Sequence, residues 1–205
     1  YTNGDKTATV TEVIFANLQN SENLVLDADF TAAAEFENAN AGTRSATLTV
    51  TLSEGAKAEN YELEKNTLAK EFTIEQAEAP VLSNVSESVT YGDNTQKTVS
   101  VPAMPTDAGT LTYTEGGTSA TNVDWSVGTD GTVKYTVSGA NAGTVITLPI
   151  VISSTNYKDT TGNVVITIAK ATPSLAITNE AALNRIYDGK MIAAEYTTNG
   201  DGVVT

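Results

Sequence analysis

The sequence predicts an all-β protein built from tandem antiparallel β-sandwich domains in an extended rod. Apolar and polar residues alternate over short stretches, and Gly, Asn and Asp residues that favour turns separate these stretches. The chain also repeats itself: Asn-Ala-Gly-Thr at residues 40–43 recurs at 141–144, and Asn-Tyr at 60–61 recurs at 156–157. A repeat of this length is the size of a domain, well above the ~20–50 residues of solenoid repeats.

Alternation with a period of two marks the individual strands. It is clearest in Arg44–Leu52 and Thr132–Ser138. The same pattern predicts further strands at Ala8–Ile14, Leu24–Phe30, Leu68–Ile74, Thr110–Tyr113, Thr144–Ile152 and Val164–Ile168. Helix signals are poor, since the alanines of Thr31–Phe36 continue a strand pattern. Pro149 has no N–H to give to a ladder, so we expect its strand to be an edge strand or to carry a bulge.

The apolar faces of these strands predict the core, because two sheets bury such faces against each other in a sandwich. The side chains expected to be buried are Leu48, Val50, Leu52, Trp125, Val133, Tyr135, Val137 and Ile166. A register shifted by one residue would place all of them on the opposite face. As a core cavity, Leu48→Ala is expected to cost ~2–5 kcal/mol of stability.

The repeat divides the chain into two units and the start of a third. Residues 1–78 are predicted to form the first sandwich, with its N-terminal strand missing, residues 79–171 the second, and residues 172–205 an incomplete third. The linkers Glu75–Pro80 and Ala169–Pro173 are short and end in proline, which predicts a semi-rigid rod. We expect the two units to share one topology, with Tyr61 and Tyr157 in equivalent places.

Composition argues against several classes of function. The 205 residues include 25 acidic and 11 basic side chains, and the net charge of −14 repels phosphate backbones, so we expect no nucleic-acid binding. Neither Cys nor His occurs, so the chain cannot form a Ser-His-Asp triad or a Cys-His pair. No apolar stretch approaches the ~18 residues that span a bilayer, so we expect no membrane insertion.

Acidic residues and the single tryptophan are the remaining candidates for a site. Asp27 and Asp29 could pair as the carboxylates of a glycosidase, but a solvated strand face is the simpler interpretation. Asp93 and Asp130 could bind calcium, yet both lie in ordinary turn sequences without the spacing of a dedicated calcium loop. Trp125 could be a sugar platform, but its alternating strand turns the indole into the core. We therefore predict no catalytic, cofactor-binding or metal-binding residue.

Three short motifs carry a resemblance to a known family. Tyr-Thr-Asn-Gly-Asp at residues 1–5, Asn-Ala-Asn-Ala-Gly-Thr at 38–43 and Ala-Glu-Asn-Tyr at 58–61 resemble the YDG-type repeat of bacterial surface proteins. The second unit is similar to the immunoglobulin-like repeats of large Firmicutes wall proteins, and residues 186–190 hold Tyr-Asp-Gly intact. The resemblance implies all-β, immunoglobulin-like modules strung along secreted or wall-anchored, commonly adhesin-like proteins, without catalytic residues. A β-grasp variant of the fold stays open.

These observations favour a non-enzymatic stalk or spacer segment of an extracellular bacterial protein at the cell surface or in the cell wall. The alternative is an adhesin module that recognises a host glycan or protein. An exposed apolar or aromatic patch would distinguish the two, because soluble monomers seldom expose large ones.

The two ends of the chain also predict a contact between molecules. Residues 172–205 are too few to bury Leu175, Ile177 and Ile186 in a core of their own. The first unit lacks the strand that precedes Tyr91 and Tyr187 in the later copies, and an unpaired edge accepts a strand from another chain. We therefore expect the C-terminal segment to add a strand to the first unit of another molecule.

Overall fold

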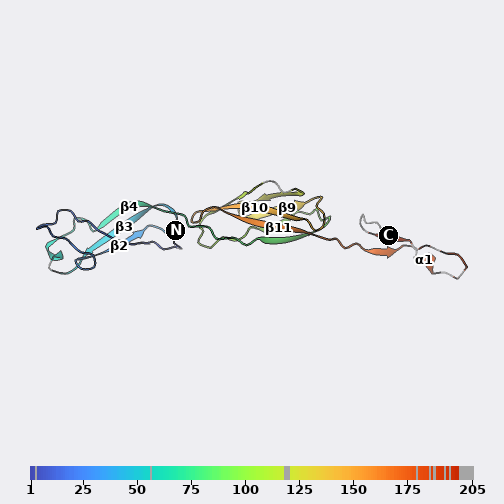
Figure 1. Cartoon of the computed structure of the whole chain (residues 1–205), viewed down its shortest axis with the longest axis horizontal. Coiled ribbons are helices and arrows are strands. Elements are labelled where there is room, and N and C mark those ends of the chain that lie inside the picture. Colours follow the sequence, from blue (N-terminus) through green and yellow to red (C-terminus); the bar gives the residue numbers. More distant parts are fainter. Residues whose placement is uncertain are drawn as a thin grey trace.

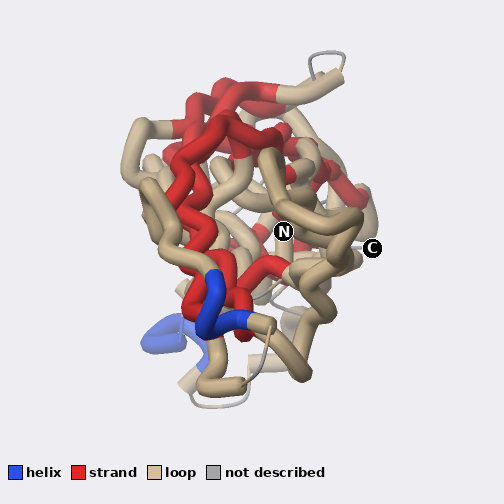
Figure 2. Tube along the Cα trace, turned by 90° about the vertical axis from the view of Figure 1, so that its left-hand side faces the viewer, coloured by secondary structure: helices blue, strands red, loops and turns tan. Residues whose placement is uncertain are grey.

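The fold is known from a computed structural model, which describes residues 1–2, 4–55, 57–117, 121–178, 180–184, 186, 188–191, 193 and 195–198. Its elements are almost all strands, which confirms the predicted all-β class. Two β regions lie end to end along the long axis of the molecule, and the strand Leu175–Ile177 (β12) lies beyond them (Figure 1). Viewed along that axis, the strands fall within one compact outline (Figure 2).

The first β region, here called the N-terminal sheet, is one antiparallel sheet of four strands. In spatial order these are Thr7–Ala8 (β1), Phe30–Phe36 (β2), Gly42–Leu52 (β3) and Thr67–Ile74 (β4). The threonines of β3 face the solvent, while Ala46 and Val50 on its other face are buried. A single 3-10 turn, Ala58–Asn60, lies in the connection from β3 to β4.

Two strands predicted for the first unit are not formed, although both segments are fully described. Ala8–Ile14 is paired only at its first residue, and Leu24–Phe30 contributes a bridge between Leu26 and Phe30. Left-handed backbone turns the chain repeatedly between β1 and β2, at Asn17, Asn20, Ser21 and Asp27. Because a strand needs extended backbone throughout, the left-handed Asp27 interrupts the predicted strand Leu24–Phe30. Ala8–Ile14 contains no left-handed residue, and it is unpaired after Ala8.

This connection, residues 9–29, covers part of one face of the N-terminal sheet. Phe15 packs edge to face against the buried Phe30, with ring centroids 4.9 Å apart. Val13 and Phe15 line a small cavity together with Val50 of β3. The first unit therefore has an irregular layer in the place where the sequence predicted a second sheet.

The second β region is a two-sheet sandwich, as predicted, and is here called the sandwich. One sheet has the order Val85–Thr90 (β5), Thr160–Ala169 (β11), Val145–Ser154 (β10) and Leu111–Glu115 (β7). The other has the order Lys97–Ser100 (β6), Thr132–Val137 (β9) and Val123–Val127 (β8). All neighbours run antiparallel except β5 and β11, which run parallel.

Alternate residues of β9, β10 and β11 form the core between the two sheets. Of the predicted core residues, Val50, Val133, Tyr135, Val137 and Ile166 are buried. Leu48, Leu52 and Trp125 are only half-buried, which corrects the prediction, although Trp125 does pack against the core. Leu48 borders a groove that is open to solvent, so its truncation opens no closed cavity.

Pro149 lies in a central strand, so the prediction of an edge strand or bulge is wrong. Its strand β10 is paired on both sides, with β11 and with β7. The Pro149 carbonyl accepts a hydrogen bond from the Gly116 N–H at 2.8 Å, just past the end of β7. In an antiparallel strand the N–H and C=O of one residue point to the same side. The N–H that proline lacks would therefore have faced the end of β7, and no bond to β11 is lost.

The two β regions share their last hairpin but not their whole topology. β3 pairs with β4 as β10 pairs with β11, and the repeated Asn-Tyr pair lies in the connection of each hairpin. The strand before the Asn-Ala-Gly-Thr corner differs, because β2 pairs with β3 whereas β9 belongs to the opposite sheet. The prediction of one shared topology is therefore wrong outside the hairpin.

Short elements follow the sandwich. β12 pairs with Tyr196–Thr198 (β13), and Glu180–Leu183 (α1) is helical. Leu175 and Ile177 are 66% and 55% exposed, so the apolar side chains of β12 are uncovered. Tyr187 of the third Tyr-Asp-Gly motif lies outside the described residues, and the expected contact of this segment with another molecule stays a prediction.

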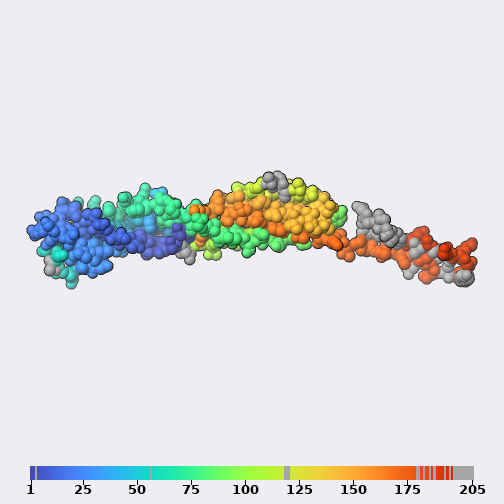
Figure 3. Space-filling model, in the orientation of Figure 1, coloured from blue at the N-terminus to red at the C-terminus, as the bar shows by residue number. Residues whose placement is uncertain are grey.

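The N-terminal sheet and the sandwich form one continuous elongated body in the space-filling view (Figure 3). Over the described part of the chain, no helix is long and apolar enough to cross a membrane.

Candidate functional site

The candidate functional site is the junction at which the loop between β10 and β11 meets the end of the N-terminal sheet. Ser154 shapes this loop: its hydroxyl donates to the Tyr157 carbonyl at 3.0 Å and accepts the Tyr157 N–H at 2.9 Å. The loop thereby holds Asn156 and Tyr157 against the first β region. Asn156 is only 1% exposed, which makes it one of the few buried polar residues described.

The Asn156 side chain joins three segments that are far apart in sequence. Its Oδ1 accepts the N–H of Ala41 at 2.9 Å, and its Nδ2 donates to Asn40 Oδ1 at 3.1 Å and to the Asp107 carbonyl at 2.7 Å. Asn40 and Ala41 open the Asn-Ala-Gly-Thr corner of the N-terminal sheet. The buried amide thus has a partner at both ends, as buried polar groups require. One repeated motif therefore binds the other across the junction.

Two tyrosines share one carboxylate beside this amide. The Tyr157 hydroxyl donates to the Asp107 carboxylate at 3.0 Å, and the Tyr1 hydroxyl donates to the same group at 3.1 Å. Their rings meet edge to face with centroids 5.8 Å apart. Burial, together with the hydrogen bond to the Asp107 carboxylate, raises the pKa of both tyrosines above the usual value for a phenol. Both hydroxyls therefore stay protonated, and stay donors, at neutral pH.

The linker between the two β regions is also bound to the loop. The Ala77 N–H donates to the Asn156 carbonyl, and the Lys158 N–H donates to the Ala77 carbonyl, both at 2.9 Å. The Gln76 side-chain amide donates to the Ser154 carbonyl at 2.9 Å. Lys158 also forms an ion pair with Glu78, but both side chains are exposed, so this pair adds little. The backbone of the linker is therefore fixed by ladder-like bonds.

The chemistry of the junction is that of attachment. Apart from the exposed pair of Lys158 and Glu78, its polar side chains are amides, phenols, the Ser154 hydroxyl and the Asp107 carboxylate. Each contacts another group of the same chain across or beside the junction. Amide and phenol groups bonded in this way hold surfaces in register. The junction therefore fixes the position of one β region on the other.

The acidic pair considered for glycoside hydrolysis does not form a catalytic arrangement. Asp27 has left-handed backbone and lies in a turn rather than on the predicted strand. Asp29 caps that turn, since its carboxylate accepts the Val25 N–H at 2.9 Å. Lys57 lies 3.9 Å from the same carboxylate. Both residues lie in a surface turn, so the predicted strand at this position is wrong.

The two aspartates considered for calcium are used in local turns. Asp93 pairs with Lys97 at 2.8 Å and accepts the N–H and hydroxyl of Thr95, and these contacts hold the pKa of its carboxyl well below the usual range. Asp130 accepts the N–H and hydroxyl of Thr132, which also lowers its pKa. Among the described residues, no three acidic side chains come together as metal ligands would.

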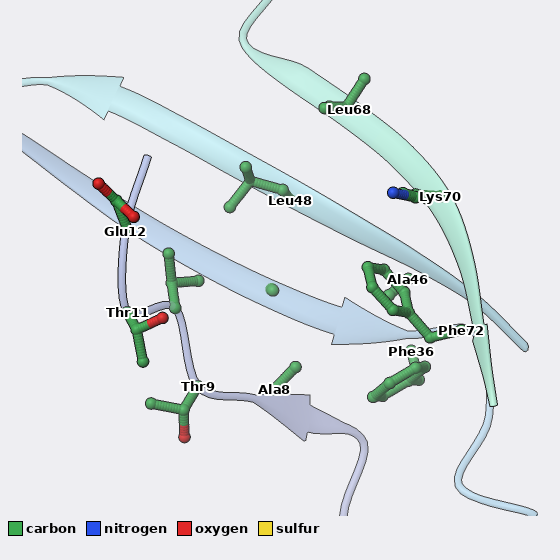
Figure 4. Close-up of a pocket in the computed structure, with 12 residues that line it drawn as sticks. Ala8, Thr9, Thr11, Glu12, Phe36, Ala46, Leu48, Leu68, Lys70 and Phe72 are labelled. Carbon is green, nitrogen blue, oxygen red and sulfur yellow. The ribbon is translucent and has the colours of Figure 1, made fainter. Parts of the chain in front are cut away.

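An apolar groove crosses the N-terminal sheet where the irregular connection leaves the sheet face open. It has a volume of about 310 Å³ and is bordered by Leu48, Leu68, Phe36 and Phe72 (Figure 4). Phe36 and Phe72 meet edge to face at 6.4 Å, and the Lys70 ammonium lies 5.8 Å from the Phe72 ring centre. Leu68 and Phe72 are 65% and 49% exposed. This groove is an exposed apolar patch of the kind that would favour ligand binding.

Sequence reasoning identified the repeated Asn-Tyr and Asn-Ala-Gly-Thr motifs but not their contact. The sequence prediction placed Tyr61 and Tyr157 in equivalent positions and gave Asn156 no role of its own. The signal available in the sequence was an asparagine kept in both copies although it sits between strands, where loops ordinarily vary. What the sequence could not give was the partner, because the contact joins residues more than a hundred positions apart.

The comparisons with known proteins show little. No family model and no curated protein matches the chain. Among solved structures, an endo-fucoidan hydrolase of glycoside hydrolase family 107 aligns at 15% identity and a TM-score of 0.33, over 70% of this chain and 24% of the hydrolase. The human desmocollin-1 ectodomain aligns at 13% and 0.32, over 65% and 28%. The Bacteroides ovatus protein SGBP-B of a mixed-linkage glucan utilization locus, in complex with a heptasaccharide, aligns at 12% and 0.16, over 67% and 37%.

The chain thus spans between 24% and 37% of the length of these three structures. At such identities and TM-scores the likeness carries no inference about activity or ligands.

Proposed function

We propose that this chain is a stalk segment, a non-enzymatic spacer that extends and presents another part of a secreted or wall-anchored bacterial surface protein. The observation that carries the proposal is the junction, in which Asn156 of one repeat binds Asn40 and Ala41 of the other. A flexible tether would need no buried amide at the contact. A spacer that must hold its length needs such a contact, because side-chain and backbone hydrogen bonds restrict the motion of one module relative to the next.

One further feature supports a place outside the cell. The resemblance to YDG-type and immunoglobulin-like wall repeats rests on the same motifs that form the junction. Protease treatment of intact source cells, followed by mass spectrometry, tests the location. Release of peptides of this chain is expected, and their retention until the cells are lysed would contradict it.

Interspin distances test the stalk function directly. The chain has no cysteine, so Thr47→Cys on β3 and Thr147→Cys on β10 give two unique, exposed labelling sites, one on each β region. A stalk predicts one narrow distance distribution in pulsed electron resonance. Asn156→Ala should broaden it, whereas Asn163→Ala, an exposed amide paired with Asn84 away from the junction, should not. A broad distribution in the unmodified chain would refute the stalk function.

A second candidate function is recognition of a host glycan or protein, which the groove of the N-terminal sheet favours. Exposed Phe72 and Leu68 supply the apolar patch that distinguishes an adhesin module from a plain spacer. A glycan array and pull-down from host extracellular matrix, each with wild type and Phe72→Ala, test it. Binding that Phe72→Ala abolishes supports recognition at the groove, and equal behaviour of the two proteins removes this candidate.

Strand addition between chains is a third proposal, which concerns self-association. β11 carries a parallel neighbour, β5, whereas the equivalent strand β4 is an edge strand of its sheet. Leu175 and Ile177 of β12 are exposed and could cover this edge in another molecule. Sedimentation velocity over a range of concentrations should show dimers that Leu175→Asp with Ile177→Asp removes. A wild-type chain that stays monomeric throughout would rule it out.

A further inference from the structure

The sandwich ends, at the side away from the junction, in a near copy of the surface that the junction covers. At the end of the N-terminal sheet, the N-terminal ammonium of Tyr1 donates to the Glu75 carbonyl, directly after β4. At the far end of the sandwich, the Tyr91 N–H donates to the Ala169 carbonyl, the last residue of β11, at 2.8 Å. A tyrosine is therefore fixed beside the end of the last strand in both regions.

The Asn-Ala-Gly-Thr corner stands in the same relation to that strand in both places. Gly42 pairs with Ile74 at the end of β4. The Gly143 N–H donates to the Ile168 carbonyl near the end of β11 at 2.8 Å. Both glycines have positive φ, of 114° and 88°, which other residues rarely adopt. Corner, tyrosine and strand end thus form one composite surface that occurs twice.

The two copies of this surface differ in what covers them. In the junction the loop with Asn156 lies on the first copy, so that Ala41 is 5% exposed. In the second copy Tyr91 is 52% exposed, and Asn141 and Ala142 are exposed as well. An asparagine side chain placed over Ala142 would find the same N–H that Ala41 offers to Asn156.

The complementary loop is also present twice. Tyr61 follows Asn60 in the β3–β4 connection, which lies at the outer end of the N-terminal sheet, away from the sandwich (Figure 1). The Tyr61 hydroxyl donates to the Glu22 carboxylate at 2.6 Å, as the Tyr157 hydroxyl donates to Asp107. In both loops a carboxylate fixes the tyrosine that follows the asparagine. Each β region thus carries a loop at one end and a receiving surface at the other.

We propose that the outer end of the sandwich, formed by Tyr91, Asn141, Ala142 and Ala171, is a binding surface for the Asn-Tyr loop of a further copy of this repeat. The incoming asparagine takes the Ala142 N–H on its Oδ1 and donates to Asn141 Oδ1, and the incoming tyrosine ring packs on Tyr91. Ala171 stands where Ala77 stands in the junction, two residues after the carbonyl that the tyrosine nitrogen binds. Because loop and surface are different, the contact is head to tail, and it can pass from one copy to the next. The inference rests on the proposed stalk function and extends it to the coupling of successive modules.

Crosslinking between copies of the full chain tests the proposal, since the chain contains no cysteine. Glu78 and Lys158 contact each other in the junction, and their repeat equivalents are Thr172 and Glu62. Glu62→Cys chains are therefore mixed with Thr172→Cys chains and treated with a short thiol-specific crosslinker. The control pair replaces Thr172→Cys by Ser126→Cys, an exposed position in β8. The mixed dimer with Thr172→Cys should form at least about tenfold faster than the control dimer, and a tenfold difference corresponds to ~1.4 kcal/mol.

Asn60→Ala in the Glu62→Cys chain should reduce the rate to that of the Ser126→Cys control. A single chain with Glu78→Cys and Lys158→Cys serves as the reference for a formed contact. Equal rates for Thr172→Cys and Ser126→Cys, or rates unaffected by Asn60→Ala, would overturn the proposal. The interspin distance between β3 and β10 is measured within one chain and tests only the stalk function. A narrow distance distribution together with no specific crosslink would therefore refute this inference and leave the stalk function standing.

Discussion

Asn156→Ala is the change that tests the junction most directly. Its side chain makes three hydrogen bonds, to Ala41, Asn40 and the Asp107 carbonyl, and is 1% exposed. A buried hydrogen bond contributes about 1 kcal/mol net, so removing three costs ~2–4 kcal/mol in total. We expect the cost to stay above that of a single exposed hydrogen bond, because Asn156→Ala leaves the Ala41 N–H and the Asp107 carbonyl without these partners inside the contact.

Urea titration with two probes measures this loss. Far-ultraviolet circular dichroism follows both β regions, while fluorescence of Trp125, the only tryptophan, follows the sandwich. Asn156→Ala should lower the free energy of unfolding by ~2–4 kcal/mol and separate the two transitions. Asn163→Ala, which loses one exposed bond to Asn84, should cost below ~1 kcal/mol.

Asn156→Asp refines the test. The carboxylate keeps an acceptor for the Ala41 N–H but loses the donor to Asp107 and adds a negative charge beside its carboxylate. We expect a loss at neutral pH at least as large as that of Asn156→Ala. If both variants unfolded with the midpoint and single transition of wild type, the argument that Asn156 holds the two regions together would fail.

Three further predictions concern the loop, the core and alkaline pH. A Cβ added at Gly109, which has φ of +77°, would lie 2.8 Å from the Thr155 Cβ, so Gly109→Ala should cost more than Gly139→Ala, where the left-handed backbone alone costs ~1–2 kcal/mol; urea titration compares them. Ile166→Ala should lose ~2–5 kcal/mol in the same titration, and Leu48→Ala clearly less, because Ile166 is fully buried and Leu48 borders the open groove. Burial raises the pKa of Tyr135 to about 12, so the folded state favours the protonated phenol. The stability that this preference contributes is complete below pH ~10 and is lost as the pH rises toward ~12, so the melting temperature should fall over this range in wild type and not in Tyr135→Phe.

The alternation of apolar and polar residues predicted the strands that bury one face in the core. Residues 45–52 and 132–137 alternate without interruption, and both lie in strands that turn one face toward the core. The prediction failed between residues 9 and 29, where the alternation is less regular and residues 13–15 are all apolar. The left-handed backbone at Asn17 and Asn20 turns the chain there. Asparagine adopts this conformation at little cost, and the alternation of apolar and polar residues does not reveal where it does so.

Topology and the candidate site depended on information that periodicity does not hold. The corner at residues 40–43 is identical in sequence to that at 141–144, yet the strands before them, β2 and β9, join different sheets. Alternation specifies which face of a strand is dry but not which neighbour it pairs with. The junction was hidden for a similar reason, because Asn156 meets partners that no local rule connects to it.

The parallel pairing of β5 with β11 has a mechanical consequence. The chain enters the sandwich through β5 at the junction and leaves it through β11 at the opposite end, and the two strands are paired side by side from Val85 with Val164 to Thr90 with Ala169 (Figure 1). Tension along the molecule pulls these neighbours in opposite directions along their length. All hydrogen bonds between them then bear the load together in shear, so none can open before the others. A module threaded in this way resists stretching at the very pair of strands through which the tension passes.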